Sequence, residues 1–262
     1  MGRQGRHCAL DQTHYNKLSS LNTQLVQQLA IHTFDNGVRV YEHHLLDIQR
    51  VRYRRRNVHE ENEEDVFLAT LVNVPSGRIF LNVGAAVGYY AILAKLKRPD
   101  LQVHAVEPLP CHIERFKENL ALNGLRPEDI PLHEVAVSGN DETTARLLDA
   151  SYGSRLLDPY EVTPKRVAWV KSIPLGEICR EIASHIYLLQ MDIQGLELQV
   201  LERFFARTDR SLIHTFLIGT HSERIHFSVI ALLQRHGCLV TLECANPPHQ
   251  PDGIVLAENS PQ

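Results

Sequence analysis

The sequence predicts an α/β fold with one doubly wound, largely parallel sheet. Three observations support this: short apolar runs alternate with helical patterns, a glycine-bearing turn follows the first run, and acidic residues directly follow two of the runs. Strands that alternate with helices form parallel sheets because each crossover helix covers one face of the sheet. A chain of 262 residues with 44% hydrophobic residues can bury one such core.

The first strand and helix are predicted at residues 79–83 and 87–97. Gly84 and Gly88 lie in the turn between them, and glycine lets a backbone turn sharply and come close to a ligand. Their spacing is G-x-x-x-G, whereas the turn that binds a pyrophosphate reads G-x-G-x-x-G. The turn therefore favours S-adenosylmethionine, which has no phosphate, over NAD.

The next strand, residues 103–106, ends in Glu107. A carboxylate at this place can accept hydrogen bonds from both hydroxyls of a ribose. Pro108 follows it and is expected to shape the adenine side of the pocket. The strand, turn and helix of residues 79–97 and the strand that ends in Glu107 together predict a nucleotide-cofactor pocket.

The rest of the sequence continues the alternation of predicted strands and helices. Helices are predicted at residues 113–124, 198–205 and 225–233, and strands at residues 132–137, 186–191, 213–218, 238–243 and 254–258. Residues 138–173 are polar and irregular, and we expect a hairpin or a mobile loop over the site there.

The N-terminal part reads as an extension. Four leucines at helical spacing predict a helix that ends near His32 and covers the main domain: Leu18, Leu21, Leu25 and Leu29. Asn36-Gly37 predicts a hairpin turn within residues 34–41. We expect an extension of residues 1–66 on the substrate side and a main domain of residues 67–262.

A charged segment joins the two parts. Five arginines precede five acids: Arg50, Arg52, Arg54, Arg55 and Arg56, then Glu60, Glu61, Glu63, Glu64 and Asp65. The segment is either a solvated helix start or a place where arginines bind an anionic substrate group. His59 and Glu60 are expected in a solvated loop, and a lid over the acceptor is the alternative.

In the segments Arg78–Tyr89 and Val103–Pro108 the chain resembles the FkbM-type methyltransferase family. The first motif of that family reads D-V-G-A-N-x-G-Y-Y, and its second strand ends in E-P. Matching stretches follow in the expected order at residues 116–124, 135–137, 172–175 and 189–197, so the resemblance runs from about residue 60 to about residue 258. It implies a Rossmann-like seven-stranded sheet of the class I methyltransferase type, with the last strand antiparallel, and S-adenosylmethionine as cofactor.

Three residues depart from the family pattern. Asn82 and Ala86 stand where the first motif has Asp and Asn, and Gln194 stands where D-x-E-G has Glu. Asn82 can still accept a hydrogen bond from the cofactor amine, but without charge attraction the bond is weaker. These departures motivate an alternative interpretation, a non-catalytic binding protein that retains the methyltransferase fold.

The site is expected at the carboxyl ends of the strands, where open α/β sheets bind their ligands. Residues expected to bind the cofactor are Asn82, Gly84, Ala85, Gly88, Tyr89, Glu107, Pro108 and Ala136. Asp192 and His221 follow two later strands, and either can remove a proton from an acceptor hydroxyl. For His221 the alternative is a cap on the following helix, and Tyr90 is expected in the core.

The predicted function is S-adenosylmethionine-dependent O-methylation of a hydroxyl on a small molecule. The family resemblance suggests a sugar or a glycosylated or polyketide-like metabolite. An amine acceptor stays open, and a NAD-dependent oxidoreductase is a further alternative that the glycine spacing disfavours.

Composition narrows the partners. A net charge of -4 offers no positive field for nucleic acid. No apolar run reaches the roughly 20 residues that cross a bilayer, and no secretory signal is present, so we expect no membrane partner and a cytoplasmic protein. Five cysteines without C-x-x-C and fifteen histidines without H-E-x-x-H predict neither a disulfide framework nor a metal site. The oligomeric state does not follow from the sequence.

Overall fold

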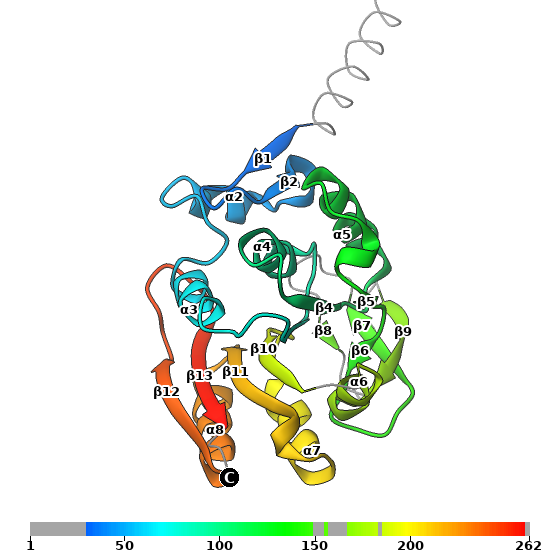
Figure 1. The fold of residues 1–262 in the computed structure, drawn as a ribbon, viewed down its shortest axis with the longest axis vertical. Coiled ribbons are helices and arrows are strands. Elements are labelled where there is room, and N and C mark those ends of the chain that lie inside the picture. Colours follow the sequence, from blue (N-terminus) through cyan, green and yellow to red (C-terminus); the bar gives the residue numbers. More distant parts are fainter. Residues whose placement is uncertain (1–29, 149–154, 157–166, 183–184, 260–262) are drawn as a thin grey trace, which may run out of the picture.

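A computed structural model describes residues 30–148, 155–156, 167–182 and 185–259. A seven-stranded sheet of order β12-β13-β11-β10-β3-β4-β5 forms its centre (Figure 1). The strands are β3 (Ile79–Val83), β4 (Gln102–Val106), β5 (Leu132–His133), β10 (Ile186–Met191), β11 (Ile213–Thr220), β12 (Cys238–Cys244) and β13 (Gly253–Asn259). Within this sheet, β13 runs antiparallel to both of its neighbours, β11 and β12, and the other neighbouring strands pair in parallel. The predicted doubly wound sheet with an antiparallel last strand is confirmed.

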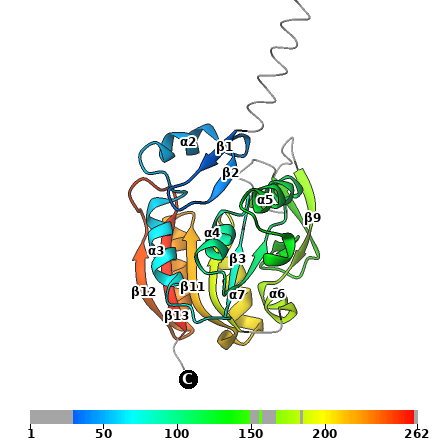
Figure 2. The same ribbon diagram turned by 45° about the horizontal axis from the view of Figure 1, so that its top comes forward.

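Helices cover both faces of this sheet, as Figure 2 shows. They are α3 (Glu61–Leu71), α4 (Tyr89–Lys97), α5 (Pro110–Leu122), α6 (Leu175–Glu181), α7 (Glu197–Arg207) and α8 (Glu223–Arg235), with short 3-10 turns at Pro127–Asp129 and Arg210–Leu212. One core layer contains apolar residues of α3, α4 and α5, and the other contains those of α6, α7 and α8. Within the described residues, no helix has the length and apolar character needed to cross a bilayer.

The central strands are apolar on both faces because both faces are covered. Leu188 packs in the layer of α3 to α5, and its neighbour Leu189 packs in the opposite layer. Phe80 and Leu81 of β3 divide in the same way. Alternate side chains of a strand point to opposite faces, so a parallel strand between two helix layers reads as a continuous apolar run.

Two predicted boundaries are wrong. The helix expected from residue 87 begins at Tyr89, because Gly88 with φ +93° still belongs to the turn. The strand expected at residues 132–137 divides into β5 and β6 (Ala136–Val137), and β6 pairs with β9 (Val167–Ile173) instead of joining the main sheet.

A second sheet lies in the interval that the sequence left irregular. Its order is β6-β9-β7-β8, with β7 (Thr144–Leu148) and β8 (Arg155–Leu156). Strand β7 pairs antiparallel with both β8 and β9. The expected hairpin therefore corresponds to antiparallel strands in this part of the chain.

The extension begins with the predicted hairpin, β1 (Ile31–Thr33) and β2 (Arg39–Tyr41). The predicted leucine helix at residues 18–29 lies outside the described residues, and its expected end near His32 is wrong because His32 belongs to β1. A 3-10 turn (Glu42–His44) and α2 (Asp47–Tyr53) follow. The boundary predicted at residue 66 falls inside α3, and the division into an extension and a main domain stays a prediction.

Candidate functional site

A cavity of about 640 Å³ opens at the carboxyl ends of β3, β4 and β10. We call its two parts the β4 side and the β10 side, with β3 between them. The β4 side comprises residues 85–87, Val106, Glu107, Pro108, His112 and residues 135–137, and the β10 side comprises Arg52, His59, Glu60, Tyr90, Gln190, Asp192, Gln250 and Asp252. The cavity thus lies at the edge of the sheet where the sequence predicted it.

The glycines of the β3–α4 turn are required by the protein itself. Gly84 and Gly88 have φ of +84° and +93°, in the left-handed region that favours glycine. A Cβ on Gly84 would lie 1.9 Å from the backbone oxygen of Asp192, and one on Gly88 would lie 2.6 Å from the ring of Phe116. The turn was predicted correctly, but the atoms that exclude a side chain here are protein atoms and not a ligand.

Backbone strain is concentrated at this cavity. Ala86, Gln194 and His249 are the non-glycine residues with positive φ in the described part of the chain, at +47°, +58° and +67°. All three line the cavity. Such conformations cost free energy and cluster at functional sites, so their position here marks the cavity as functional.

Glu107 lies at the end of β4 as predicted, and its carboxylate is held by backbone amides. Its Oε2 accepts from the N–H of Ala86 at 2.8 Å, and its Oε1 accepts from the N–H of Leu109 at 2.9 Å. The Nδ1 of His112 lies 3.3 Å from the same Oε1. Each carboxylate oxygen has two lone pairs, so Glu107 can still accept further hydrogen bonds. Pro108 and Ala136 line the same side.

Asn82 occupies the end of β3 between the two sides. Its Nδ2 donates to Oε1 of Gln190, whereas its Oδ1 has no hydrogen-bond partner although the residue is buried. A buried oxygen without a donor is costly. The orphaned Oδ1 therefore points to a ligand that donates a hydrogen bond.

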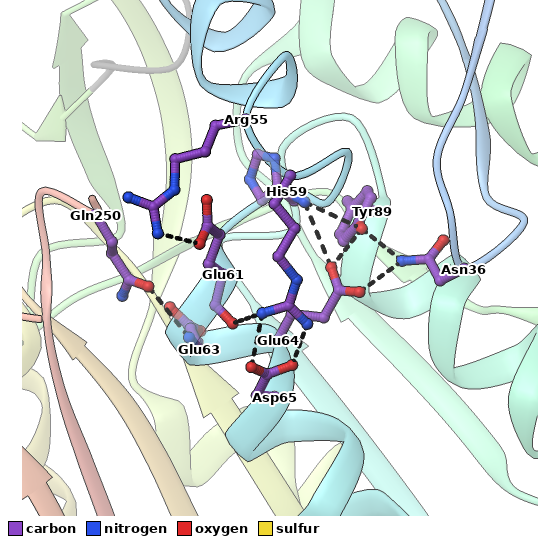
Figure 3. Close-up of polar contacts among 10 residues, drawn as sticks. Asn36, Arg55, His59, Glu61, Glu63, Glu64, Asp65, Tyr89 and Gln250 are labelled. Atoms are coloured by element: carbon purple, nitrogen blue, oxygen red, sulfur yellow. Dashed lines mark hydrogen bonds and ion pairs between the residues drawn. The ribbon is translucent and has the colours of Figure 1, made fainter. Parts of the chain in front are cut away.

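The two tyrosines after Gly88 both line the cavity. The hydroxyl of Tyr89 donates to Glu64 at 2.5 Å and accepts from Nδ2 of Asn36 at 2.6 Å, contacts that Figure 3 shows. The hydroxyl of Tyr90 has no partner. Tyr90, which was expected in the core, therefore also borders the cavity.

His221 lies among three carboxylates. Its Nε2 is 3.2 Å from Oδ1 of Asp192 and 3.3 Å from Oδ1 of Asp252, and its Nδ1 is 3.0 Å from Oε1 of Glu197. Burial opposes its charge, but the contacts with Asp192 and Glu197 prevail and raise the pKa of His221 to about 11. An imidazolium cannot take a proton, so this geometry does not suit the base predicted here. The cap of α8 is Ser222, so the capping alternative is also wrong.

Asp192 lines the cavity at the end of β10, as predicted. Burial alone would raise the pKa of Asp192, but its hydrogen bond and charge interaction with His221 outweigh burial and lower it. The Nε2 of Gln194 also donates to Oδ1 of Asp192 at 3.2 Å. Asp192 is therefore ionised at the edge of the cavity.

The arginine run is divided among its acidic neighbours. Arg55 pairs with Glu61 at 3.0 Å and Arg56 with Asp65 at 2.5 Å, as Figure 3 shows for Arg55. These pairs are exposed or partly exposed and agree with a solvated helix start. Arg52 differs, because it lines the cavity with its Nη1 3.6 Å from Oε1 of Glu60.

The expectation of a solvated loop is wrong for Glu60, which is 7% exposed. Burial, then the charges of Glu63 and Asp192, raise the pKa of Glu60 well above its ordinary value. Burial, then Asp192, raises the pKa of Glu63 to about 8 and that of Asp252 to about 6. The β10 side therefore concentrates carboxylates that repel one another.

Sequence reasoning missed several of these residues. Gln250 and Asp252 carried no motif, Glu63 was one of several acids in a charged run, and Gln190 lay in the matching stretch of residues 189–197 without a predicted role. The available signal was the position of Gln190 two residues before Asp192 in an otherwise apolar strand, because an amide there is seldom buried without a partner.

Comparison with known proteins identifies the family of the chain. A family model described as "Methyltransferase FkbM domain" matches residues 82–239, more than half of the chain. Similar solved structures include a precorrin-6y C5,15-methyltransferase of Geobacter metallireducens GS-15, with 13% identity over 75% of this chain and 87% of that chain and a TM-score of 0.46. A putative tRNA (m1A22) methyltransferase of Streptococcus pneumoniae in complex with S-adenosyl-L-methionine has 14% identity over 76% and 73%, with a TM-score of 0.47. No curated protein matches the chain.

Proposed function

Because the chain belongs to the FkbM methyltransferase family and is an S-adenosylmethionine-dependent methyltransferase, we propose that it methylates a hydroxyl group on a small molecule. Family membership disfavours both alternatives that the sequence left open, the nicotinamide-dependent oxidoreductase and the non-catalytic binding protein. The acceptor class and the roles of individual residues below are parts of this proposal.

The residues of β3 and the β4 side fit the cofactor. Glu107 offers acceptor capacity to the ribose hydroxyls, and the orphaned Oδ1 of Asn82 offers it to the amine of the methionine part. Ala85, Pro108 and Ala136 would contact its apolar surface. When bound, the cofactor supplies a methyl group on a positively charged sulfur.

One observation carries the small-molecule assignment: the extension lines the β10 side of the cavity. Arg52, His59 and Glu60 border the same space as Asp192 at the end of β10. The whole cavity, with its cofactor part included, has a volume of about 640 Å³, within the range of about 300 to 1,000 Å³ that is usual for small-molecule sites. An acceptor must enter this space to reach Asp192, which favours a small molecule over a folded macromolecule.

The charge of the β10 side supports the same assignment. Glu60, Asp192 and Asp252 line it and Glu63 lies directly behind. Carboxylates repel the phosphates that dominate binding of nucleic acids. A hydroxyl-rich acceptor such as a sugar can instead donate hydrogen bonds to them.

Methyl transfer to a hydroxyl needs alignment of the acceptor and removal of one proton. Asp192 is the residue placed to accept that proton, because it is ionised and borders the cavity. His221 acts on Asp192 and not on the acceptor, since it holds Oδ1 and keeps the carboxylate charged. We therefore assign Asp192 as the catalytic residue and His221 as a positioning residue.

Methyl-labelled S-adenosylmethionine tests this proposal. The purified chain is incubated with separate panels of sugars and glycosylated metabolites, of small amines, and of tRNA, and the labelled products are identified by mass spectrometry. Label on a hydroxyl of a small molecule is the expected result. Label that enters only the amines or only the tRNA would overturn the acceptor assignment.

A further inference from the structure

Three carboxylates meet where α3 begins beside the end of β10. One oxygen each of Glu60, Glu63 and Asp192 lie within 4.8 Å of one another. Glu63 is completely buried and Glu60 nearly so. Like charges at this separation repel strongly in a buried site, so the carboxylates must either share protons or be neutralised by positive charge from another source.

The neighbouring acids do not share this need. Glu61 pairs with Arg55 and Asp65 with Arg56, and Figure 3 draws the contact of Glu61 with Arg55. Glu64 is held by the hydroxyl of Tyr89. The acids of this helix start are thus divided into a partnered group and the two that face Asp192.

Within the cluster, one oxygen of each carboxylate contacts a neighbouring side chain, and the other oxygen is available to a ligand. Glu60 directs Oε1 toward Arg52 at 3.6 Å, and Oε1 of Glu63 accepts from Nε2 of Gln190 at 2.9 Å. Oε2 of Glu60 and Oε2 of Glu63 are buried and accept no hydrogen bond from an N–H or hydroxyl donor, although the two carboxyl groups lie close enough to hydrogen-bond each other when one is protonated. The contacts of Asp192 with His221 and Gln194 are made by Oδ1. Metal ligands are typically oriented in this way, by outer hydrogen bonds to the atom that does not bind the ion.

Tyr90 gives a separate sign that a ligand belongs here. It lines the cavity beside Glu60, and its buried hydroxyl has no partner. A neutral hydroxyl can accept a hydrogen bond from a water molecule on a bound ion.

A second cluster shows the contrast. Asp192 and Glu197 also lie around His221, but there the two ring nitrogens of His221 contact them, Nε2 at 3.2 Å from Oδ1 of Asp192 and Nδ1 at 3.0 Å from Oε1 of Glu197. No ion pair in the described part of the chain includes Glu63, and Arg52 is the cation recorded beside Glu60. The unmet charge therefore lies on the α3 side of Asp192.

We propose that Glu60, Glu63 and Asp192 bind a divalent metal ion, Mg²⁺ or Mn²⁺ by chemistry, on the β10 side of the cavity. The ligand atoms are all carboxylate oxygens, which suit these hard cations, and two positive charges together with Arg52 balance the three negative ones. The sequence predicted no metal because its ligands come from separate segments without a recognised spacing. Only the use of the ion rests on the proposed function: an ion here would bind the acceptor oxygen and lower the pKa of its hydroxyl.

Direct binding of the metal tests the site without an acceptor. The full chain is freed of metal with a chelator, and Mn²⁺ is titrated into it by calorimetry and by electron paramagnetic resonance. We expect one ion per chain, with affinity weakened more than about tenfold in Glu63→Gln and in Glu60→Gln. Glu61→Gln is the matched control, because it removes a carboxylate from the same helix turn that pairs with Arg55.

Two results would overturn the site. One is no uptake of Mn²⁺ by the wild-type chain at millimolar concentration, with or without S-adenosylhomocysteine, which would leave the carboxylates sharing protons. The other is equal affinity in Glu63→Gln and Glu61→Gln, whose folding is checked by thermal unfolding. Metal uptake without methylation of any hydroxyl would retain the site and refute the proposed acceptor. Full hydroxyl methylation by a chain that binds no metal would refute the metal site and retain the proposed acceptor.

Discussion

The β4 side and the β10 side of the cavity satisfy their polar groups in opposite ways. On the β4 side a single carboxylate, Glu107, accepts from the backbone amides of Ala86 and Leu109, which lie near it in the fold. On the β10 side, the carboxylates of Glu60 and Glu63 are buried close to Asp192, and one oxygen of each accepts from no N–H or hydroxyl donor. The protein's own amides hold the carboxylate of the β4 side, whereas the carboxylates of the β10 side form the cluster for which we propose a metal ion.

The largest effect is expected from Asp192→Asn. If the β10 side performs the chemistry, removing its proton acceptor should lower kcat by roughly 10² to 10⁴-fold with little change in cofactor affinity. Turnover and calorimetric titration with S-adenosylhomocysteine separate the two quantities. Asp141→Asn, an exposed carboxylate paired with Arg203, is the control. Unchanged turnover in Asp192→Asn would move the chemistry elsewhere.

Removing His221 should act mainly on stability. His221→Ala leaves Asp192, Glu197 and Asp252 without their cation, and breaking a buried ion pair typically costs about 3 kcal/mol or more. Because the folded pKa of about 11 exceeds the ordinary 6.5, this stabilisation is complete below pH 6.5 and is lost as pH rises toward 11. Denaturant unfolding across this range measures both effects.

His185→Ala is the control for His221→Ala, since His185 is exposed and should change stability by less than about 0.5 kcal/mol. An unfolding free energy of His221→Ala equal to that of the wild type at neutral pH would mean that the three carboxylates do not depend on this imidazolium.

Glu107→Ala tests the β4 side. The ribose hydroxyls would lose their acceptor, so the affinity for S-adenosylhomocysteine should fall by about 2 kcal/mol, roughly 30-fold. Calorimetry measures the affinity, and thermal unfolding checks that the turn survives without the contacts to Ala86 and Leu109. Glu134→Ala, in an exposed pair with Lys117, serves as control. A folded Glu107→Ala with wild-type affinity would show that the cofactor lies elsewhere.

The smallest effect concerns backbone strain in the β3–α4 turn. Ala86 has φ +47°, which costs about 1 kcal/mol for a residue with a Cβ, so Ala86→Gly should raise stability by up to that amount. Ala85→Gly is the matched control, because Ala85 does not have positive φ and should lose stability through added freedom of the unfolded chain. Thermal unfolding compares them, and a lower melting temperature for Ala86→Gly would contradict the strain.

The elements that the sequence predicted well are those decided by neighbouring residues. The turn at Gly84 and Gly88, Glu107 at the end of β4, and Asp192 at the end of β10 all lie where the motifs indicated. The strand expected at residues 132–137 was wrong because β6 leaves the main sheet to pair with β9. The paired residues, such as Ala136 and Ser172, are 36 positions apart, so no local pattern reveals the pairing.

The sequence alone determined that a doubly wound sheet forms, the succession of its main strands and helices along the chain, and the family to which the chain belongs. It could do so because apolar periodicity and a compact motif are local properties. Only the tertiary structure decided the β10 side. There Glu60 and Glu63 from the helix start, Asp192 from β10 and Asp252 from the segment before β13 meet across long separations in the chain. Their effect on one another depends on distance and burial, and so does the pKa of His221, which the contacts with Asp192 and Glu197 raise to about 11 against the effect of burial. These quantities exist only after the strands have been brought side by side.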